Sequence, residues 1–123
     1  MVSMEHTQRA VLDPATLDRL VSETGGADVG RQIVGLYLDE MPGRLAALAH
    51  GVDGGRENLH RVAHSLRSSS ALLGVRALEG LCGGLESEAK DASSNDVDEM
   101  VAGVHACAAV STLALREWLA RLG

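Results

Sequence analysis

Residues 56–73, RENLHRVAHSLRSSSALL, decide the fold, because they carry an apolar face at helical spacing and contain neither Gly nor Pro. At about 100° per residue, most of the apolar positions fall within one sector of a helix and the charged positions lie outside it. Gly74 ends the pattern. The stretch therefore predicts an amphipathic helix, with an inner face made of Leu59, Val62, Ala63, Leu66, Ser70 and Leu73.

Two helices are predicted before this central segment. The pair Asp13-Pro14 combines a capping side chain with Pro at the first helical position, and Gly25-Gly26 ends the short helix that it starts. Asp28 is the expected cap of a second, longer helix. Pro42 lies inside this second helix and lacks a backbone N–H, so we expect it to bend the helix or to divide it.

Two further helices are predicted after the central segment. The first of them runs from about residue 75 to residue 90, and the last helix follows a turn at residues 91–95, with Asp96 as its expected cap. Another turn is predicted at residues 51–55, GVDGG. Short connections between long helices are typical of antiparallel bundles. We therefore predict an all-α fold, an antiparallel four-helix bundle with an additional short N-terminal helix.

Composition indicates one helical domain and argues against several classes of function. A chain of 123 residues with 46% hydrophobic residues can bury one core, and its aromatic content of 2% is low for a β protein. We assign residues 13–123 to the bundle and residues 1–12 to a flexible N-terminal segment. The net charge of −6 opposes binding to nucleic acid. No apolar run reaches the roughly 20 residues that span a bilayer, so we expect no membrane segment and a cytoplasmic location.

The polar face of the central helix concentrates groups that can hold a phosphoryl group. His64 lies about 160° from Leu66 on the helical wheel, so we expect it at the surface. Arg67 follows three residues later, at a spacing where helix side chains meet, and a guanidinium can hold a phosphate with two bonds. An imidazole can act as the nucleophile, and phosphoryl transfer requires mainly positioning and charge stabilisation. An exposed His on a helix face is usually a solvated residue without a task, and spacing alone favours that interpretation for His64.

The stretch from Ala63 to Val75, AHSLRSSSALLGV, resembles the signature of histidine-containing phosphotransfer (HPt) domains, which reads approximately A-H-x-L-K-G-S-S-x-x-L-G-A. The His, the Leu two residues later, the basic residue, two serines and the Leu-Gly pair are in register. The resemblance continues upstream at residues 11–20 and 37–38 and downstream at residues 78–86. Two positions differ from the family pattern, because Arg67 stands in place of Lys and Ser68 in place of Gly.

The resemblance implies a phosphorelay intermediate. Such a protein is a phosphocarrier and not an enzyme, and it has no ATP-dependent kinase activity of its own. His64 would accept a phosphoryl group from the aspartate of one receiver domain and pass it to another. Arg67 would stabilise that group, and Glu86 would hydrogen-bond to His64, unless Glu86 is only a solvated charge. The residues expected to border His64 or to contact the receiver are His60, Ser68, Ser69, Ala71, Leu72 and Glu86.

The same resemblance implies the partners. They would be the receiver domains of response regulators and a sensor histidine kinase, which can be a hybrid kinase. The receiver would hold the Mg²⁺, and this chain would need no cofactor of its own. We expect the protein to be a monomer.

Two alternatives use the same residues differently. The bundle could dock on a receiver or a kinase without phosphotransfer, leaving His64 unused. His60 and His64 also form an HxxxH pair, which on a helix can chelate Zn²⁺ or Cu²⁺. Further ligands would have to come from His50, His105 or Glu57, which nothing in the sequence places nearby, so we expect no metal site.

Overall fold

The computed structural model describes residues 11–90 and 96–122, with residues 51–54 described by their backbone alone. The described residues form helices and contain no strand, which confirms the predicted all-α class. Five helices have described bounds: α2 (Pro14–Thr24), α3 (Ala27–Gly54), α4 (Arg56–Leu72), α5 (Arg76–Ala89) and α6 (Val97–Arg121).

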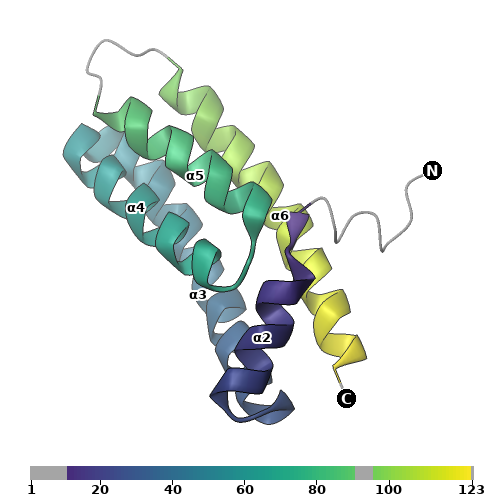
Figure 1. Ribbon diagram of the computed structural model, residues 1–123. Coiled ribbons are helices and arrows are strands. Elements are labelled where there is room, and N and C mark those ends of the chain that lie inside the picture. The colour runs from purple at the N-terminus through teal and green to yellow at the C-terminus, as the bar shows by residue number, and fades with distance from the viewer. Residues whose placement is uncertain (1–10, 91–95, 123) are drawn as a thin grey trace.

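The four long helices form the predicted antiparallel bundle, and the short helix α2 packs at one end of it (Figure 1). Helix α4 packs against α3 and α5, and α6 packs against the same two helices. Helices α4 and α6 therefore occupy opposite corners of the bundle. Their outer faces point in opposite directions, which separates any site on α4 from the outer surface of α6.

The inner faces of the helices meet in one apolar core. On α4, the residues Leu59, Ala63 and Leu66 are fully buried, in agreement with the predicted inner face. Ser70 is also buried, and its hydroxyl lies 2.7 Å from the hydroxyl of Tyr37 on α3. This hydrogen bond gives both buried hydroxyls a partner and joins the two helices.

Helix α6 is the described helix that is long and apolar enough to cross a membrane, judged by length and composition alone. One side of α6 is buried in the bundle, at Val97, Val101, Val104 and Ala108 and onward to Trp118. The core helix of a soluble protein passes the same test, so this property is weak evidence for a membrane span.

The structure corrects several predicted boundaries. The N-cap of α3 is Gly26, so Asp28 lies in the first turn and is not the cap. Helix α3 is not divided at Pro42, which is exposed. The helix can continue because a Pro at its surface removes only a single backbone hydrogen bond. The helix also continues through residues 51–54, so the predicted turn shortens to Gly55, with φ 106°. Tertiary packing often overrides the weak helix propensity of such residues.

The predicted limit between flexible segment and bundle also shifts. Residues 1–10 lie outside the described residues. Val11 and Leu12 fall within the predicted flexible segment, but they are buried in the core. Burial of these apolar side chains ties the start of the described chain to the bundle.

The beginning of α2 is fixed to the connection between α4 and α5. The backbone N–H of Asp13 donates to the carbonyl of Gly74 at 2.7 Å. The carboxylate of Asp13 accepts a hydrogen bond from Thr16 and pairs with Arg76 at 3.0 Å. Asp13 occupies the predicted N-cap position, but its side chain makes no capping bond to the backbone. The same holds for Asp96 at the start of α6.

Gly74 is required at this connection, and Gly74→Ala is expected to destabilise the fold. Its φ is 72°, and an added Cβ would lie 2.8 Å from Cβ of Thr16 and 2.9 Å from the carbonyl oxygen of Asp13. We expect a loss of about 1–3 kcal/mol in the free energy of unfolding, measured by urea denaturation. Gly80→Ala is the matched control, because a Cβ at this position in α5 meets nothing within 4 Å. Equal unfolding midpoints for the two variants would contradict the prediction.

Candidate functional site

His64 lies in the middle of α4, on the side that α5 approaches. Its side chain is 54% exposed, which agrees with its position on the helical wheel. Glu86 on α5 projects toward it, and Glu86 Oε1 lies 2.8 Å from Nδ1 of His64. The Glu86 side chain is only 14% exposed, so it is held between the two helices and is not a freely solvated charge.

The contacts of the imidazole determine which nitrogen carries the proton. Arg67 Nη2 lies 3.3 Å from the same Nδ1 atom that contacts Glu86. A guanidinium can only donate and a carboxylate can only accept, so Nδ1 cannot hydrogen-bond to both. The contact with Glu86 is shorter and involves a charged acceptor, which favours an Nδ1–H donor. In the neutral imidazole we therefore assign the proton to Nδ1, which leaves the lone pair on Nε2.

Glu86 also binds Arg67, so one carboxylate joins the histidine to the arginine. Arg67 Nε lies 2.6 Å from Glu86 Oε2, while Oε1 holds His64. Desolvation alone would raise the pKa of Glu86, but the hydrogen bond from His64 and the charge of Arg67 outweigh it and keep the pKa below its usual value. The carboxylate is therefore ionised at neutral pH and holds both side chains in place.

Gly83 makes room for this arrangement and was not among the predicted site residues. A Cβ at Gly83 of α5 would lie 3.3 Å from Cδ of Arg67. The arginine side chain passes over this glycine toward Glu86, which lies three residues later on the same helix. Its sequence signal is a Gly-Gly pair inside a helix, because each Gly there costs about 1 kcal/mol relative to Ala.

The remaining residues predicted around His64 lie along the same helix, with different surroundings. The ring of His60 is 6.5 Å from that of His64, and its Nδ1 atom is buried without a hydrogen-bond partner among the described atoms. Ser68 is exposed and Ala71 is half-buried. Ser69 donates to the carbonyl of Ser65 at 3.1 Å and accepts a hydrogen bond from Arg44.

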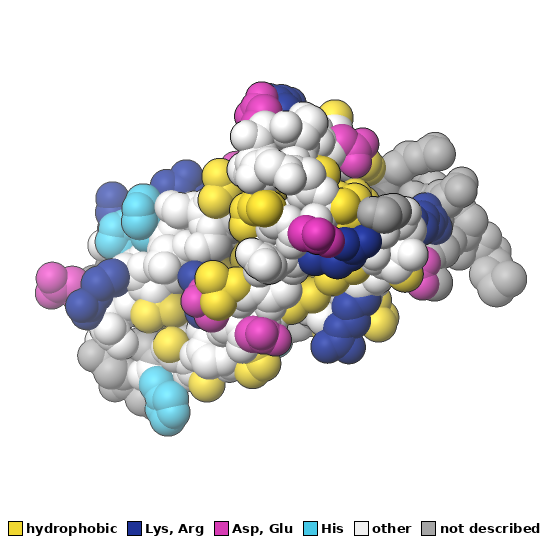
Figure 2. All heavy atoms as spheres, turned by 90° about the horizontal axis from the view of Figure 1, so that it is seen from below, with side chains coloured by type: hydrophobic (Ala, Val, Ile, Leu, Met, Phe, Trp, Pro, Cys, Tyr) yellow, Lys and Arg dark blue, Asp and Glu magenta, His cyan; other side chains and the backbone are white. Residues whose placement is uncertain are grey.

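An apolar patch lies two turns beyond His64 on α4. Leu72 and Leu36 are 63% and 59% exposed, and both line a shallow pocket of about 150 Å³ with Ile33 of α3. Eight residues along a helix correspond to about 12 Å, so the patch is close enough to His64 to be covered by the same partner domain. Figure 2 shows hydrophobic side chains at the surface of this end of the molecule, among acidic and basic ones.

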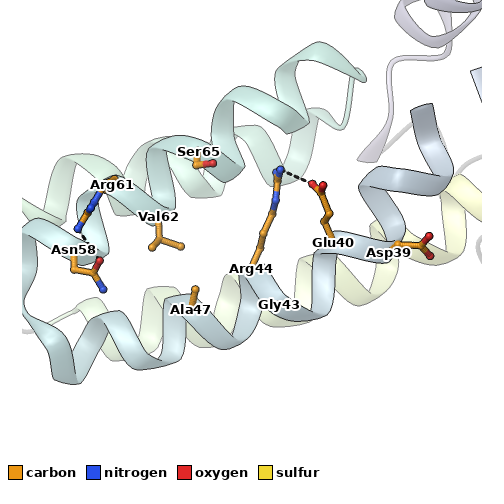
Figure 3. Close-up of a pocket in the computed structure, with 9 residues that line it drawn as sticks. All are labelled: Asp39, Glu40, Gly43, Arg44, Ala47, Asn58, Arg61, Val62 and Ser65. Carbon is orange, nitrogen blue, oxygen red and sulfur yellow. Dashed lines mark hydrogen bonds and ion pairs between the residues drawn. The ribbon is translucent and has the colours of Figure 1, made fainter. Parts of the chain in front are cut away.

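A groove of about 590 Å³ runs between α3 and α4 beside Ser65. Arg44 extends across it from α3 and pairs with Glu40 at 2.8 Å, and Arg61 of α4 hydrogen-bonds to Asn58 (Figure 3). Among Arg44, Arg61 and Arg67, the side chain that contacts the His64 ring is that of Arg67. This groove could not be predicted from the sequence, because its walls come from two separate helices.

The described residues do not assemble a metal site around the histidine pair. No group of three His, Cys, Asp or Glu side chains in residues 11–90 and 96–122 is arranged to hold a metal ion. A stable zinc site needs three or four protein ligands. The polar chemistry of this face is therefore that of an exposed imidazole, a carboxylate and a guanidinium.

Comparison with protein-family models gives one finding. The model of the Hpt domain matches residues 32–123, which contain most of α3 and all of α4, α5 and α6. The comparisons with curated proteins and with solved structures found no match. The matched region includes the whole cluster of His64, Arg67 and Glu86.

Proposed function

This chain belongs to the Hpt domain family, and we propose that it carries a phosphoryl group on Nε2 of His64 between the aspartates of receiver domains. Hpt domains are phosphocarrier modules, not kinases, and they act in two-component signalling with receiver domains and histidine kinases. The observation that carries the proposal for His64 is its hydrogen bond to Glu86. This bond occupies Nδ1 and leaves the lone pair of Nε2 on an exposed ring.

The proposed transfer starts from the phosphoaspartate of a receiver. The lone pair of Nε2 attacks phosphorus, the N–P bond forms, and the bond from phosphorus to the aspartate oxygen breaks, so that the carboxylate leaves with its electron pair. The imidazole gains positive charge in this step and keeps its proton on Nδ1. Glu86, 2.8 Å from Nδ1, stabilises that charge and holds the ring in one orientation.

Arg67 is proposed to stabilise the phosphoryl oxygens. Its guanidinium already contacts the His64 ring at 3.3 Å, and only part of its five-donor fork faces Glu86. Mg²⁺ is assigned to the receiver, and we assign no cofactor to this chain. Transfer onward is the reverse reaction, with the aspartate of another receiver attacking the phosphorus of phospho-His64.

The receiver is proposed to dock over His64 and the apolar patch, and Leu72→Asp tests this placement. An exposed leucine that a partner covers contributes through burial, and a charge at its position would have to be desolvated. We expect receiver affinity to fall about tenfold or more, as measured by isothermal titration calorimetry. Leu113→Asp is the matched control, since Leu113 is 62% exposed but lies on α6, at the opposite corner of the bundle. Equal affinities for both variants would place the receiver elsewhere.

Transfer of label from a phosphorylated receiver tests the proposed function. The purified protein is mixed with ³²P-labelled phospho-receivers and Mg²⁺, and the label on this chain is followed. The expected product is acid-labile and alkali-stable, as phosphohistidine is, and ³¹P–¹⁵N correlation should place phosphorus on Nε2. Binding to a receiver without transfer would instead support the alternative, a docking domain that does not use His64.

A further inference from the structure

Helix α6 carries two seams with the spacing of a coiled coil, and only one of them is used inside the bundle. The inner seam faces the core and consists of Val97, Val101, Val104, Ala108, Ser111, Leu115 and Trp118, all buried. The outer seam repeats at alternating intervals of three and four residues on the opposite side. It consists of Glu99, Ala102, Ala106, Ala109, Leu113, Arg116 and Ala120, all exposed.

The outer seam is apolar in its centre and charged near its ends. Between Glu99 and Arg116 it carries no charged residue, although 23% of the chain is charged. Leu113 is 62% exposed, and Val110 beside the seam is exposed as well. An apolar repeat of period 3.5 is the pattern by which one helix packs along another, and none of the helices α2 to α5 covers this side of α6.

For a second copy of this chain, the charges at the two ends of the outer seam favour one orientation over the other. If a second copy packed in parallel, each charge would face its own kind, Glu99 against glutamate and Arg116 against arginine. If the second copy packs antiparallel, the order of the seam is reversed and opposite charges meet. The facing pairs are then Glu99 with Arg116 of the partner subunit, Ala102 with Leu113 of the partner subunit, and Ala106 with Ala109 of the partner subunit.

We propose that the outer seam of α6 is a self-association surface, on which two copies of this chain pack antiparallel about a twofold axis. Each copy supplies the same patch, as a twofold interface requires. Alanines at the centre let the two helices approach closely, and Leu113 fills the space over Ala102 of the partner subunit. Within the described residues, neither Glu99 nor Arg116 has an ion-pair partner in its own chain, so both are available to the second copy.

This proposal replaces the monomer expected from the sequence, and it does not depend on the proposed function. Helices α4 and α6 occupy opposite corners of the bundle, so His64 stays exposed in both copies of the dimer. A single helix seam buries less area than interfaces of standard size, so weak association is expected, with dissociation constants of about 10–100 µM. The measurement must therefore cover about 1 µM to 1 mM protein.

A charge-reversal cycle tests the proposal by sedimentation equilibrium. Wild type should dimerise, while Glu99→Arg and Arg116→Glu should each weaken association at least tenfold, because each places like charges at both ends of the dimer. The double variant Glu99→Arg/Arg116→Glu reverses both signs and should restore the dimer. Both positions are exposed, and circular dichroism checks that each variant folds.

Two apolar positions and a membrane control complete the test. Leu113→Asp should abolish the dimer, whereas Leu72→Asp, on the opposite corner, should leave it unchanged. A wild type that stays monomeric up to 1 mM, or a double variant as weak as the single ones, would overturn the proposal. Binding of the wild type to phosphatidylcholine vesicles, lost in Leu113→Asp, would also overturn it, because the seam would then face a bilayer.

Discussion

His64→Gln is expected to abolish the acid-labile label that a phospho-receiver transfers to this protein. Gln has a similar length and can still reach Glu86, but its amide nitrogen has no nucleophilic lone pair, so no N–P bond can form. His64 is 54% exposed and lies outside the core, and a surface substitution of this kind usually changes the free energy of unfolding by less than about 1 kcal/mol. The variant should therefore lose all phosphoryl transfer while its free energy of unfolding changes little.

His60→Gln is the control for this prediction. His60 lies one turn earlier on α4 with its ring 6.5 Å from that of His64, so the two variants alter neighbouring positions in the same way. We expect His60→Gln to retain label transfer to within a few-fold of wild type. Transfer that survived in His64→Gln and disappeared in His60→Gln would place the phosphoryl group on His60. It would contradict the mechanism proposed for His64.

The fold followed from the sequence because each helix carries its own periodic pattern. The inner face of residues 56–73 predicted which side chains of α4 would be buried, and Leu59, Ala63 and Leu66 are buried. The predicted limits failed where local signals were weak compared with packing. Residues 51–54 contain two glycines and still continue α3. Val11 and Leu12 have no periodic neighbours before them, so only their burial shows that they belong to the core.

Spacing predicts the site only as far as one helix determines it, whereas the hydrogen bond of Glu86 to His64 is expected from the family resemblance alone. The spacing of His64 and Arg67 along α4 brings their side chains together whatever the rest of the fold does. The position of Glu86 depends on how α5 packs against α4, which no spacing within either helix determines. The same is true of Gly83, whose missing Cβ leaves room for Arg67. The proton position on His64 became assignable once both partners of Nδ1 were known.

The outer seam of α6 shows a different limit. A helical pattern in the sequence gives the apolar positions but not which of them the bundle covers. Helix α6 is apolar on two sides, and its composition alone is compatible with a membrane span. The packing of α6 against α3 and α5 separates the side that forms the core from the side that remains exposed. The exposed side is the outer seam, with Glu99 and Arg116 near its ends, and no other described helix packs on it.

Arg67→Ala is expected to slow phosphoryl transfer about 100-fold without preventing it. Removing one group that stabilises charge in a transition state typically costs about 10²–10³ in rate, while the nucleophile remains in place. Arg67→Lys should give an intermediate rate, because Lys keeps the charge but lacks the planar fork that contacts both Glu86 and the phosphoryl group. Single-turnover transfer from a phospho-receiver, compared with wild type, measures both variants. An unchanged rate in Arg67→Ala would remove this residue from the mechanism.

A titration of Glu86 separates this electrostatic role from a merely structural one. The charge of Arg67 is one of the causes that hold the pKa of Glu86 below its usual value, so Arg67→Ala should raise that pKa and Arg67→Lys should raise it less. Carboxyl ¹³C chemical shifts report the pKa directly.

A carboxylate with a lowered pKa stabilises the fold at neutral pH, and this contribution is lost as the pH falls through the lowered value. In Arg67→Ala the contribution should be smaller, and its loss should begin at a higher pH than in wild type. If the pKa of Glu86 stays the same in both variants while the rate falls, Arg67 acts on the phosphoryl group without its ion pair to Glu86. The interpretation of Arg67 and Glu86 as one electrostatic cluster would then be wrong. If rate and pKa change together, the ion pair seen at 2.6 Å belongs to the working site.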